Sequence, residues 1–186
     1  MKDLFVLDSF YPLADELRTF AKEQKFEDWL GPDGEIYKRV WIGEIPALTQ
    51  ILEELLGPID MLGQGFRLNF NEELPNAAIH SDLGWGTHAL VLYLSDGDSG
   101  TAFWKHKETG MSQIEPGDTW LFEQVNQQWN DASKWEQVHF VPMKFNRALI
   151  YKSSYFHSRY PFEAFGTDID SGRLIAVAFF TPRNQS

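Results

Sequence analysis

The chain has 186 residues, of which 43% are hydrophobic and 15% aromatic, so it can bury the core of one domain and global disorder is not expected. Its formal net charge of −11 repels phosphate backbones, and we expect no nucleic-acid partner. The absence of cysteine excludes disulfides, zinc–thiolate sites and cysteine nucleophiles.

The N-terminal residues 1–8 lack the basic region and apolar run of a signal peptide. No apolar stretch is long enough to span a bilayer. We therefore expect a cytoplasmic protein without membrane association.

The first third of the chain predicts two helices and one edge strand. Apolar residues recur at helical spacing over residues 12–25 and again over residues 47–56, where Gly57-Pro58 ends the pattern. Residues 36–42 between them predict the strand.

After residue 63 the pattern changes to short alternating runs separated by turns. Strands are expected over residues 66–70, 87–95, 101–104, 139–142, 147–152 and 174–181. Residues 123–136 are polar and are interpreted as an excursion from the sheet. Residues 1–186 are therefore expected to form a single, mainly β domain, with residues 1–60 as helical support and residues 61–186 as an antiparallel sandwich or barrel.

His80 and Asp82 lie two positions apart, and a second candidate imidazole, His157, lies far downstream. If residues 77–82 form a strand, His80 and Asp82 project from the same face. Two histidines and one carboxylate on one side of a metal are typical of non-haem ferrous oxygenases. The alternative interpretation of His80 and Asp82 is an ordinary ion pair within a sheet.

Arg173 begins the last long strand and shares a face with Ile175, Val177 and Phe179. That apolar face should point inward, and an unpaired buried guanidinium is costly. A dicarboxylate co-substrate would supply the missing anion through a two-pronged hydrogen bond.

The order His80-x-Asp82, His157, Arg173 resembles the ferrous, 2-oxoglutarate-dependent oxygenases, whose fold is a double-stranded β-helix of the jelly-roll and cupin type. The segments Thr87–Asp96 and Ser99–Phe103 look like the prolyl-4-hydroxylase branch of that class.

Further short segments extend the likeness over nearly the whole chain. Val6-Leu7-Asp8-Ser9-Phe10, Asn146-Arg147, Phe156-His157-Ser158, Phe165-Gly166 and Gly172-Arg173-Leu174 are similar to elements of uncharacterised bacterial and phage proteins of the same oxygenase type.

The resemblance implies that His80, Asp82 and His157 bind Fe²⁺. It also implies that Arg173 holds the distal carboxylate of 2-oxoglutarate, with the Tyr93 hydroxyl as second donor. Sixteen residues separate His157 from Arg173, more than in prolyl hydroxylases, and Arg159 is the alternative anchor because it lies closer to His157. We prefer Arg173 because it opens an inward-facing strand.

Other residues have two possible roles. Asn69 and Arg67, on the strand before His80, either contact the co-substrate or target or simply pack in the sheet. Residues 105–138, which with the adjoining Trp104 carry Trp120, Trp129 and Trp135, form either a lid or substrate wall or a packed surface loop.

The remaining histidines are not expected to be ligands. We expect His88 to be packed and hydrogen-bonded, and His139 to have no catalytic part. His106 is either exposed or in contact with substrate.

The implied reaction is hydroxylation of a peptide side chain or small metabolite by O₂, with succinate and CO₂ as products. A cupin-like metal-dependent isomerase is an alternative, and it would place a third histidine near the first two without needing Arg173. A catalytically silent binding module on the same fold is another. Oligomeric state has no signal in the sequence.

Overall fold

The computed structural model describes residues 3–31, 36–73, 77–115 and 117–183. The helices are α1 (Ala14–Lys22), α2 (Leu48–Leu56) and α3 (Thr119–Gln128), followed by a 3-10 turn at Ala132–Lys134. The strands are β1 (Leu4–Leu7), β2 (Glu27–Leu30), β3 (Ile36–Ile42), β4 (Ile59–Asn69), β5 (His88–Tyr93), β6 (Gly100–His106), β7 (Trp135–Pro142), β8 (Ala148–Lys152), β9 (His157–Tyr160) and β10 (Arg173–Pro182). None of the helices in these ranges is long and apolar enough to cross a membrane.

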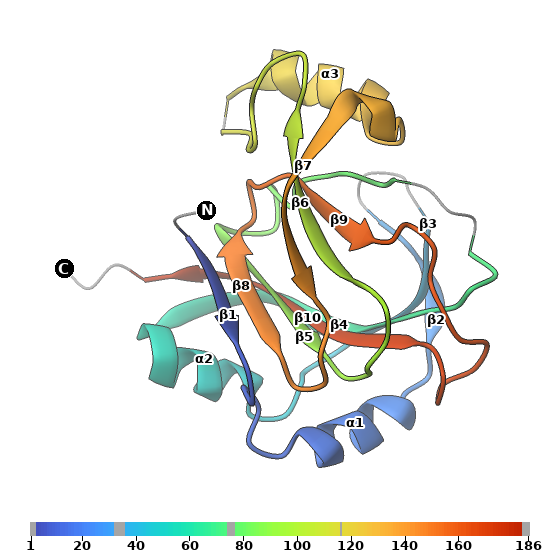
Figure 1. Cartoon of the computed structure of the whole chain (residues 1–186). Coiled ribbons are helices and arrows are strands. Elements are labelled where there is room, and N and C mark those ends of the chain that lie inside the picture. The colour runs from blue at the N-terminus through green and yellow to red at the C-terminus, as the bar shows by residue number, and fades with distance from the viewer. Residues whose placement is uncertain (1–2, 32–35, 74–76, 116, 184–186) are drawn as a thin grey trace.

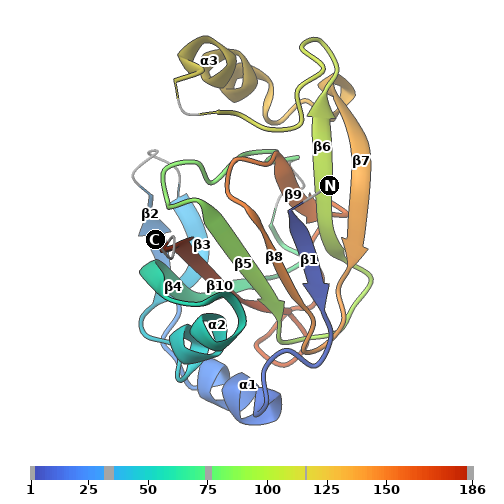
Figure 2. The same cartoon turned by 90° about the vertical axis from the view of Figure 1, so that its left-hand side faces the viewer.

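Within the described ranges, seven strands form one sheet in the order β1-β8-β5-β10-β4-β3-β2, and three form another in the order β7-β6-β9. Neighbouring strands in both sheets run antiparallel. Figure 1 shows α1 and α2 at one end of the molecule and α3 at the other, and Figure 2 shows β6 and β7 as a layer beside β5, β8 and β1. The expected mainly β, jelly-roll architecture with supporting N-terminal helices is confirmed.

Alternation along the central strands separates two cores. On β10, Leu174, Ala176, Ala178 and Phe180 belong to the cluster that contains buried residues of α1 and α2. The intervening side chain of Ile175 belongs to a second cluster, which the residues facing the small sheet form. The period of two in a strand therefore turns one face of the large sheet to the helices and the other to the interior between the sheets.

The interior between the sheets is aromatic. Tyr93 of β5 and Tyr151 of β8 are both almost completely buried, as is Phe103 of β6. Phe103 meets the Tyr151 ring edge-on, with 5.2 Å between ring centroids. Arg173 enters this interior at the start of β10, on the face predicted from its alternation with the apolar residues.

Several expectations differ from the structure. The first 60 residues supply β1, β2 and β3 to the large sheet in addition to α1 and α2, so they are more than a helical support. The polar stretch 123–136 is not a plain excursion, because it contains the end of α3 and the start of β7. The helix expected over residues 12–25 covers only Ala14–Lys22. Strands of four residues such as β1 carry too few alternations to be recognised without their partners.

The buried ring of Phe66 on β4 gives a direct test of this packing. It is completely buried, stacks on Trp41 at 5.1 Å between centroids, and meets Phe20 of α1 at 6.1 Å. Phe66→Ala should lower the free energy of unfolding by about 3–5 kcal/mol, because it leaves a cavity between helix and sheet. Leu62→Ala, on the same strand but 54% exposed, is the control, and its free energy of unfolding should change by about 0.5 kcal/mol. Urea unfolding measures both variants. Equal losses in the two variants would contradict the assignment of this core.

Candidate metal centre

The segment that carries His80 and Asp82 is not a strand, so the prediction from its alternation was wrong. Among residues 77–87, His80 alone forms a β-bridge, and its partner is His157, the first residue of β9. The His80 N–H donates to the His157 carbonyl at 3.0 Å, and the His157 N–H donates to the His80 carbonyl at 2.8 Å. The Asp82 N–H donates to the Ser153 carbonyl, just after β8, at 2.8 Å. Backbone hydrogen bonds to two separate segments therefore hold the two residues in place.

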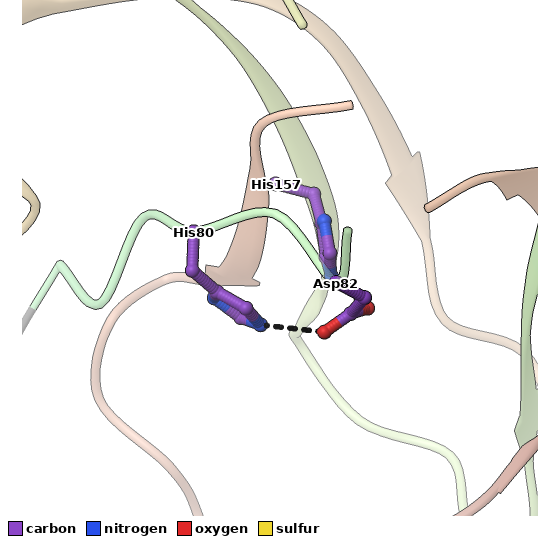
Figure 3. Close-up of side chains that lie close together, drawn as sticks. All are labelled: His80, Asp82 and His157. Carbon is purple, nitrogen blue, oxygen red and sulfur yellow. Dashed lines mark ion pairs between the residues drawn. The ribbon is translucent and has the colours of Figure 1, made fainter. Parts of the chain in front are cut away.

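The side chains of His80, Asp82 and His157 converge, as Figure 3 shows. One potential ligand atom from each lies within 4.8 Å of the other two. Asp82 Oδ1 is 3.5 Å from His80 Nε2, and Asp82 Oδ2 is 3.2 Å from His157 Nε2. Two imidazole nitrogens and one carboxylate oxygen this close can hold one divalent ion and leave further coordination positions open. The structure thus brings the three predicted ligands together.

Local hydrogen bonds orient both imidazoles. His80 Nδ1 lies 2.7 Å from the Ala78 carbonyl, and His157 Nδ1 lies 2.9 Å from the Tyr155 carbonyl. Because a carbonyl oxygen only accepts, each Nδ1 carries a proton and Nε2 is turned toward Asp82, as metal-binding histidines commonly are. Ala78 has φ of 42°, a left-handed conformation that is unfavourable for alanine and is often found near functional sites.

The electrostatics of the centre favour a cation. Burial raises the pKa of Asp82, but the charge of His157 and the hydrogen bonds from both imidazoles outweigh it and hold the pKa well below its usual range. Burial lowers the pKa of His80, but the hydrogen bond and charge of Asp82 outweigh it and the pKa is raised. The His80 side chain is 42% exposed and that of His157 only 8%, so solvent reaches the centre from the His80 side.

Arg173 is buried without a carboxylate partner among the described residues. It is 4% exposed, and its Nη1 donates to Asn69 Oδ1 at 3.2 Å, the residue opposite it on β4. Its Nε has no hydrogen-bond partner in the described part of the chain. Burial lowers the pKa of Arg173 to about 10. A buried guanidinium with an open donor is poised to bind an anion.

Tyr93 lies beside this guanidinium. The Arg173 guanidinium carbon is 5.8 Å from the centre of the Tyr93 ring, and the Tyr93 hydroxyl lies 2.8 Å from Thr101 Oγ1. Burial raises the pKa of Tyr93, so its hydroxyl keeps its proton at neutral pH and can donate. The structure therefore groups Asn69, Tyr93 and Arg173, the three residues predicted to bind the co-substrate.

Arg159, the alternative anchor, is already occupied. Its Nη1 lies 3.1 Å from Glu73 Oε2, and its Nε and Nη2 donate to the Phe162 carbonyl at 3.2 and 2.6 Å. The Nε of Arg173 has no partner among the described residues, whereas Nε, Nη1 and Nη2 of Arg159 are all hydrogen-bonded. The geometry therefore favours Arg173 as the anchor.

Glu73 is a residue that the sequence analysis missed. Its carboxylate accepts from Arg39 at 2.5 Å, from Arg159 at 3.1 Å and from Asn69 at 3.1 Å. Asn69 in turn accepts from Arg173, so Glu73 orients the asparagine that touches the open guanidinium. Glu73 follows Glu72 in a polar turn, and nothing in that turn distinguishes the buried carboxylate from the exposed one.

The other histidines do not join the centre. His88 Nδ1 lies 2.9 Å from Thr87 Oγ1 and its ring stacks on Phe180, a packed arrangement as expected. His106 is fully buried and bonded to Gln128 and Thr109, so the expected alternative of exposure is wrong. His139 is exposed on β7.

The segment 105–138 is partly core. Trp135, together with the adjoining Trp104, is buried in a third cluster, whereas Trp120 is 67% exposed. The Trp129 carbonyl accepts from the Ile79 N–H at 2.9 Å, one residue before His80. The segment thus braces the metal-binding loop, and its service as a lid stays a prediction.

The Glu73 carboxylate should contribute a pH-dependent part of the stability. Burial raises the pKa of Glu73, but the hydrogen bonds from Arg159 and Arg39 outweigh it and the pKa is lowered. The stabilisation is therefore full above its ordinary pKa of 4.5 and is lost as pH falls through the lower, folded-state pKa. Glu73→Gln should lower the free energy of unfolding by about 2 kcal/mol at pH 7, and its stability should approach that of the wild type in acid.

Thermal melts across this pH range measure the effect. Glu72→Gln, at the exposed neighbouring residue, is the matched control and should change little. A loss in Glu73→Gln that is the same at pH 7 and in acid would contradict the ion-pair network.

No curated protein matches the chain. Solved structures do, among them SnoK, a non-heme alpha-ketoglutarate-dependent carbocyclase from nogalamycin biosynthesis (12% identity, TM-score 0.58, covering 96% of this chain and 79% of SnoK). The epimerase SnoN from the same biosynthesis, also non-heme and alpha-ketoglutarate-dependent, is similar (16% identity, TM-score 0.55, 96% of this chain and 77% of SnoN). A third similar structure is HygX from Streptomyces hygroscopicus with nickel and 2-oxoglutarate bound (14% identity, TM-score 0.52, covering 97% of this chain and 83% of HygX).

At these identities the likeness shows a shared fold. A shared fold does not distinguish branches of the class, so the likeness to the prolyl-4-hydroxylase branch stays a prediction. A family model described as a family of unknown function (DUF6445) matches residues 79–180, which include His80, Asp82, His157 and Arg173. These residues make up more than half of the chain, and the chain therefore belongs to the DUF6445 family.

Proposed function

We propose that this protein is a non-haem Fe²⁺- and 2-oxoglutarate-dependent oxygenase. The observation that carries the proposal is the convergence of His80, Asp82 and His157 in a jelly roll whose interior also holds the Arg173 guanidinium, whose Nε has no partner among the described residues. Fold-level likeness to alpha-ketoglutarate-dependent enzymes supports it.

The donor set fits ferrous iron. Two neutral imidazole nitrogens and one carboxylate suit a borderline metal, and three protein ligands leave three positions of an octahedral ion for other ligands. The carbonyls that bind Nδ1 of His80 and His157 would keep both Nε2 lone pairs directed at the ion.

The residues around Arg173 fit a dicarboxylate. Asn69 fixes one end of the guanidinium, and the open Nε would donate to the distal carboxylate of 2-oxoglutarate. The Tyr93 hydroxyl, which keeps its proton, would be the second donor. The apolar walls contributed by residues such as Ile175 would exclude water from the carbon chain between the two ends.

When bound, iron and 2-oxoglutarate would supply the oxidising chemistry, with O₂ as oxidant and succinate and CO₂ as products. The protein's own residues hold the metal, orient the keto-acid and position the target. Hydroxylation of a small metabolite or peptide side chain is the outcome we propose.

The alternatives fit the residues less well. An isomerase of the cupin type would bring a third histidine to the ion, but the group formed by the described residues contains two histidines and one aspartate. A silent binding module would have no need for a buried arginine whose Nε has no partner among the described residues.

Metal binding tests the first half of the proposal. His80→Ala removes a ligand whose side chain is 42% exposed, so the fold should survive. Affinity for Zn²⁺ or Mn²⁺, measured by calorimetry, should fall by more than about 100-fold, since loss of even an outer partner of a ligand costs about 10- to 100-fold. His139→Ala, at an exposed histidine on β7, should bind like the wild type. Wild-type metal affinity in His80→Ala would refute the ligand assignment.

Co-substrate anchoring tests the second half. Arg173→Met should raise the 2-oxoglutarate concentration needed for half-maximal succinate formation by about 10- to 100-fold, because it removes a charge-assisted hydrogen bond. Arg159→Met is the matched control, and its effect should be much smaller because Arg159 is bonded to Glu73 and Phe162. The reverse ranking of the two variants would assign the anchor to Arg159.

A further inference from the structure

Four aromatic side chains form a continuous row, which we call the aromatic row: Tyr37, Trp29, Trp85 and Phe179. The Trp29 ring lies 5.6 Å from Tyr37 and 5.9 Å from Trp85, and the Trp85 ring stacks on Phe179 at 5.6 Å. All four are only partly buried. Large aromatic side chains usually bury most of their surface in a folded protein. A row of them that stays partly exposed is therefore a surface suited to a ligand.

The third member of the row, Trp85, lies next to the metal-binding loop in the chain. Trp85 follows Asp82 by three residues, and its N–H donates to the Asp82 carbonyl at 3.0 Å. Gly86, directly after it, has φ of 117°, and a Cβ there would meet the Phe180 carbonyl oxygen at 2.9 Å. The turn that places Trp85 is therefore rigidly specified. Phe179, at the other side of Trp85, lies on β10 on the same face as Arg173.

Arg67 stands at the far end of the row. Its guanidinium carbon lies 5.2 Å from the centre of the Tyr37 ring, and its buried Nε has no hydrogen-bond partner among the described residues. Arg67 is directly opposite Ile175 in the large sheet and two residues before Asn69, so it shares the interior face. Burial lowers the pKa of Arg67, whereas the charges of Glu73 and, more weakly, Asp82 act to raise it.

Neighbouring arginines have their own carboxylates. Arg39 lies 2.8 Å from Glu72, and Arg159 lies 3.1 Å from Glu73. Among the described residues, no carboxylate is bonded to the buried Nε of Arg67. Arg67 therefore has no carboxylate of its own in the described part of the chain, because Glu73 is already bonded to Arg39 and Arg159.

The proposed cofactors would not compensate it either. Asp82 and one carboxylate of 2-oxoglutarate would together balance a divalent ion, and the second carboxylate would balance Arg173. One positive charge, that of Arg67, remains. Since an unpaired buried charge is costly, a ligand that brings one negative charge to this place is favoured.

We propose that Arg67 and the aromatic row bind the prime substrate, and that this substrate is a small organic acid with a planar, apolar ring. The ring lies against the row, and its carboxylate accepts from Arg67. This inference rests on the proposed function, because the charges of iron and 2-oxoglutarate enter the argument.

The experiment uses the full-length protein loaded with redox-inert Zn²⁺ and 2-oxoglutarate. Calorimetry compares two acids, phenylacetate and indole-3-acetate, with their amides, which keep the ring and lose the charge. At least one acid should bind with an affinity about tenfold or more above that of its amide, because it gains a hydrogen bond to a charged group. Equal binding of acid and amide, or binding of neither, overturns the proposal.

Variants locate the effect. Arg67→Met should abolish the preference for acid over amide, and Arg67→Lys, which keeps the charge, should retain part of it. Arg18→Met removes a matched arginine that lies 4.4 Å from the Phe145 ring on the opposite, helical side, and should leave the preference unchanged. Trp85→Leu should weaken acid and amide alike.

Two results separate failure of the inference from failure of the function. If Arg67→Met weakens 2-oxoglutarate binding and leaves the acid preference intact, Arg67 belongs to the co-substrate and the inference is wrong while the function stands. If the wild type binds neither Zn²⁺ nor 2-oxoglutarate, the proposed function fails, and the charge argument fails with it.

Discussion

The reciprocal pair of backbone hydrogen bonds between His80 and His157 is the contact on which the candidate centre depends. His157 belongs to β9, which pairs with β6 of the small sheet. The neighbouring N–H of Asp82 bonds to Ser153, at the end of β8 in the large sheet. One short loop is thereby fastened to both layers of the jelly roll. Hydrogen bonds between main-chain atoms position these residues, so their side chains remain free for a metal.

The interior behind the centre is electrically unlike the rest of the molecule. The chain carries a net charge of −11, yet Arg67, Arg159 and Arg173 all face the space between the sheets. Glu73 satisfies one of them, and the open Nε atoms of the other two mark where anions are expected. Burying an unpaired guanidinium costs stability, and such a cost is typical of sites that are completed by a ligand. Two anionic ligands, a co-substrate for Arg173 and a substrate for Arg67, would provide partners for both Nε atoms.

Several elements were predictable from the sequence because their signals are local. Alternation on β10 placed Arg173 inward correctly, and the strand at residues 36–42 was predicted with its observed bounds. The helix at residues 47–56 was predicted to within one residue. The strand assumed for His80 and Asp82 was wrong, because this loop gains its order from partners that are 50 or more residues away, among them Trp129, Ser153 and His157. Glu73 was missed for the same reason: its partners Arg39 and Arg159 lie on strands that only the fold brings near it.

The sequence by itself determined the mainly β class, the three candidate metal ligands and the two candidate anchoring arginines. Periodicity is a local property and suffices for the fold class, whereas the ligands and the anchors were implied by the resemblance to the 2-oxoglutarate-dependent oxygenases. Only the tertiary structure decided that the three ligands converge, that Arg159 is occupied, and that the Nε atoms of Arg173 and Arg67 have no partner among the described residues. These facts depend on which strands become neighbours, and strand order is set by long-range pairing and burial, which no short stretch of sequence contains.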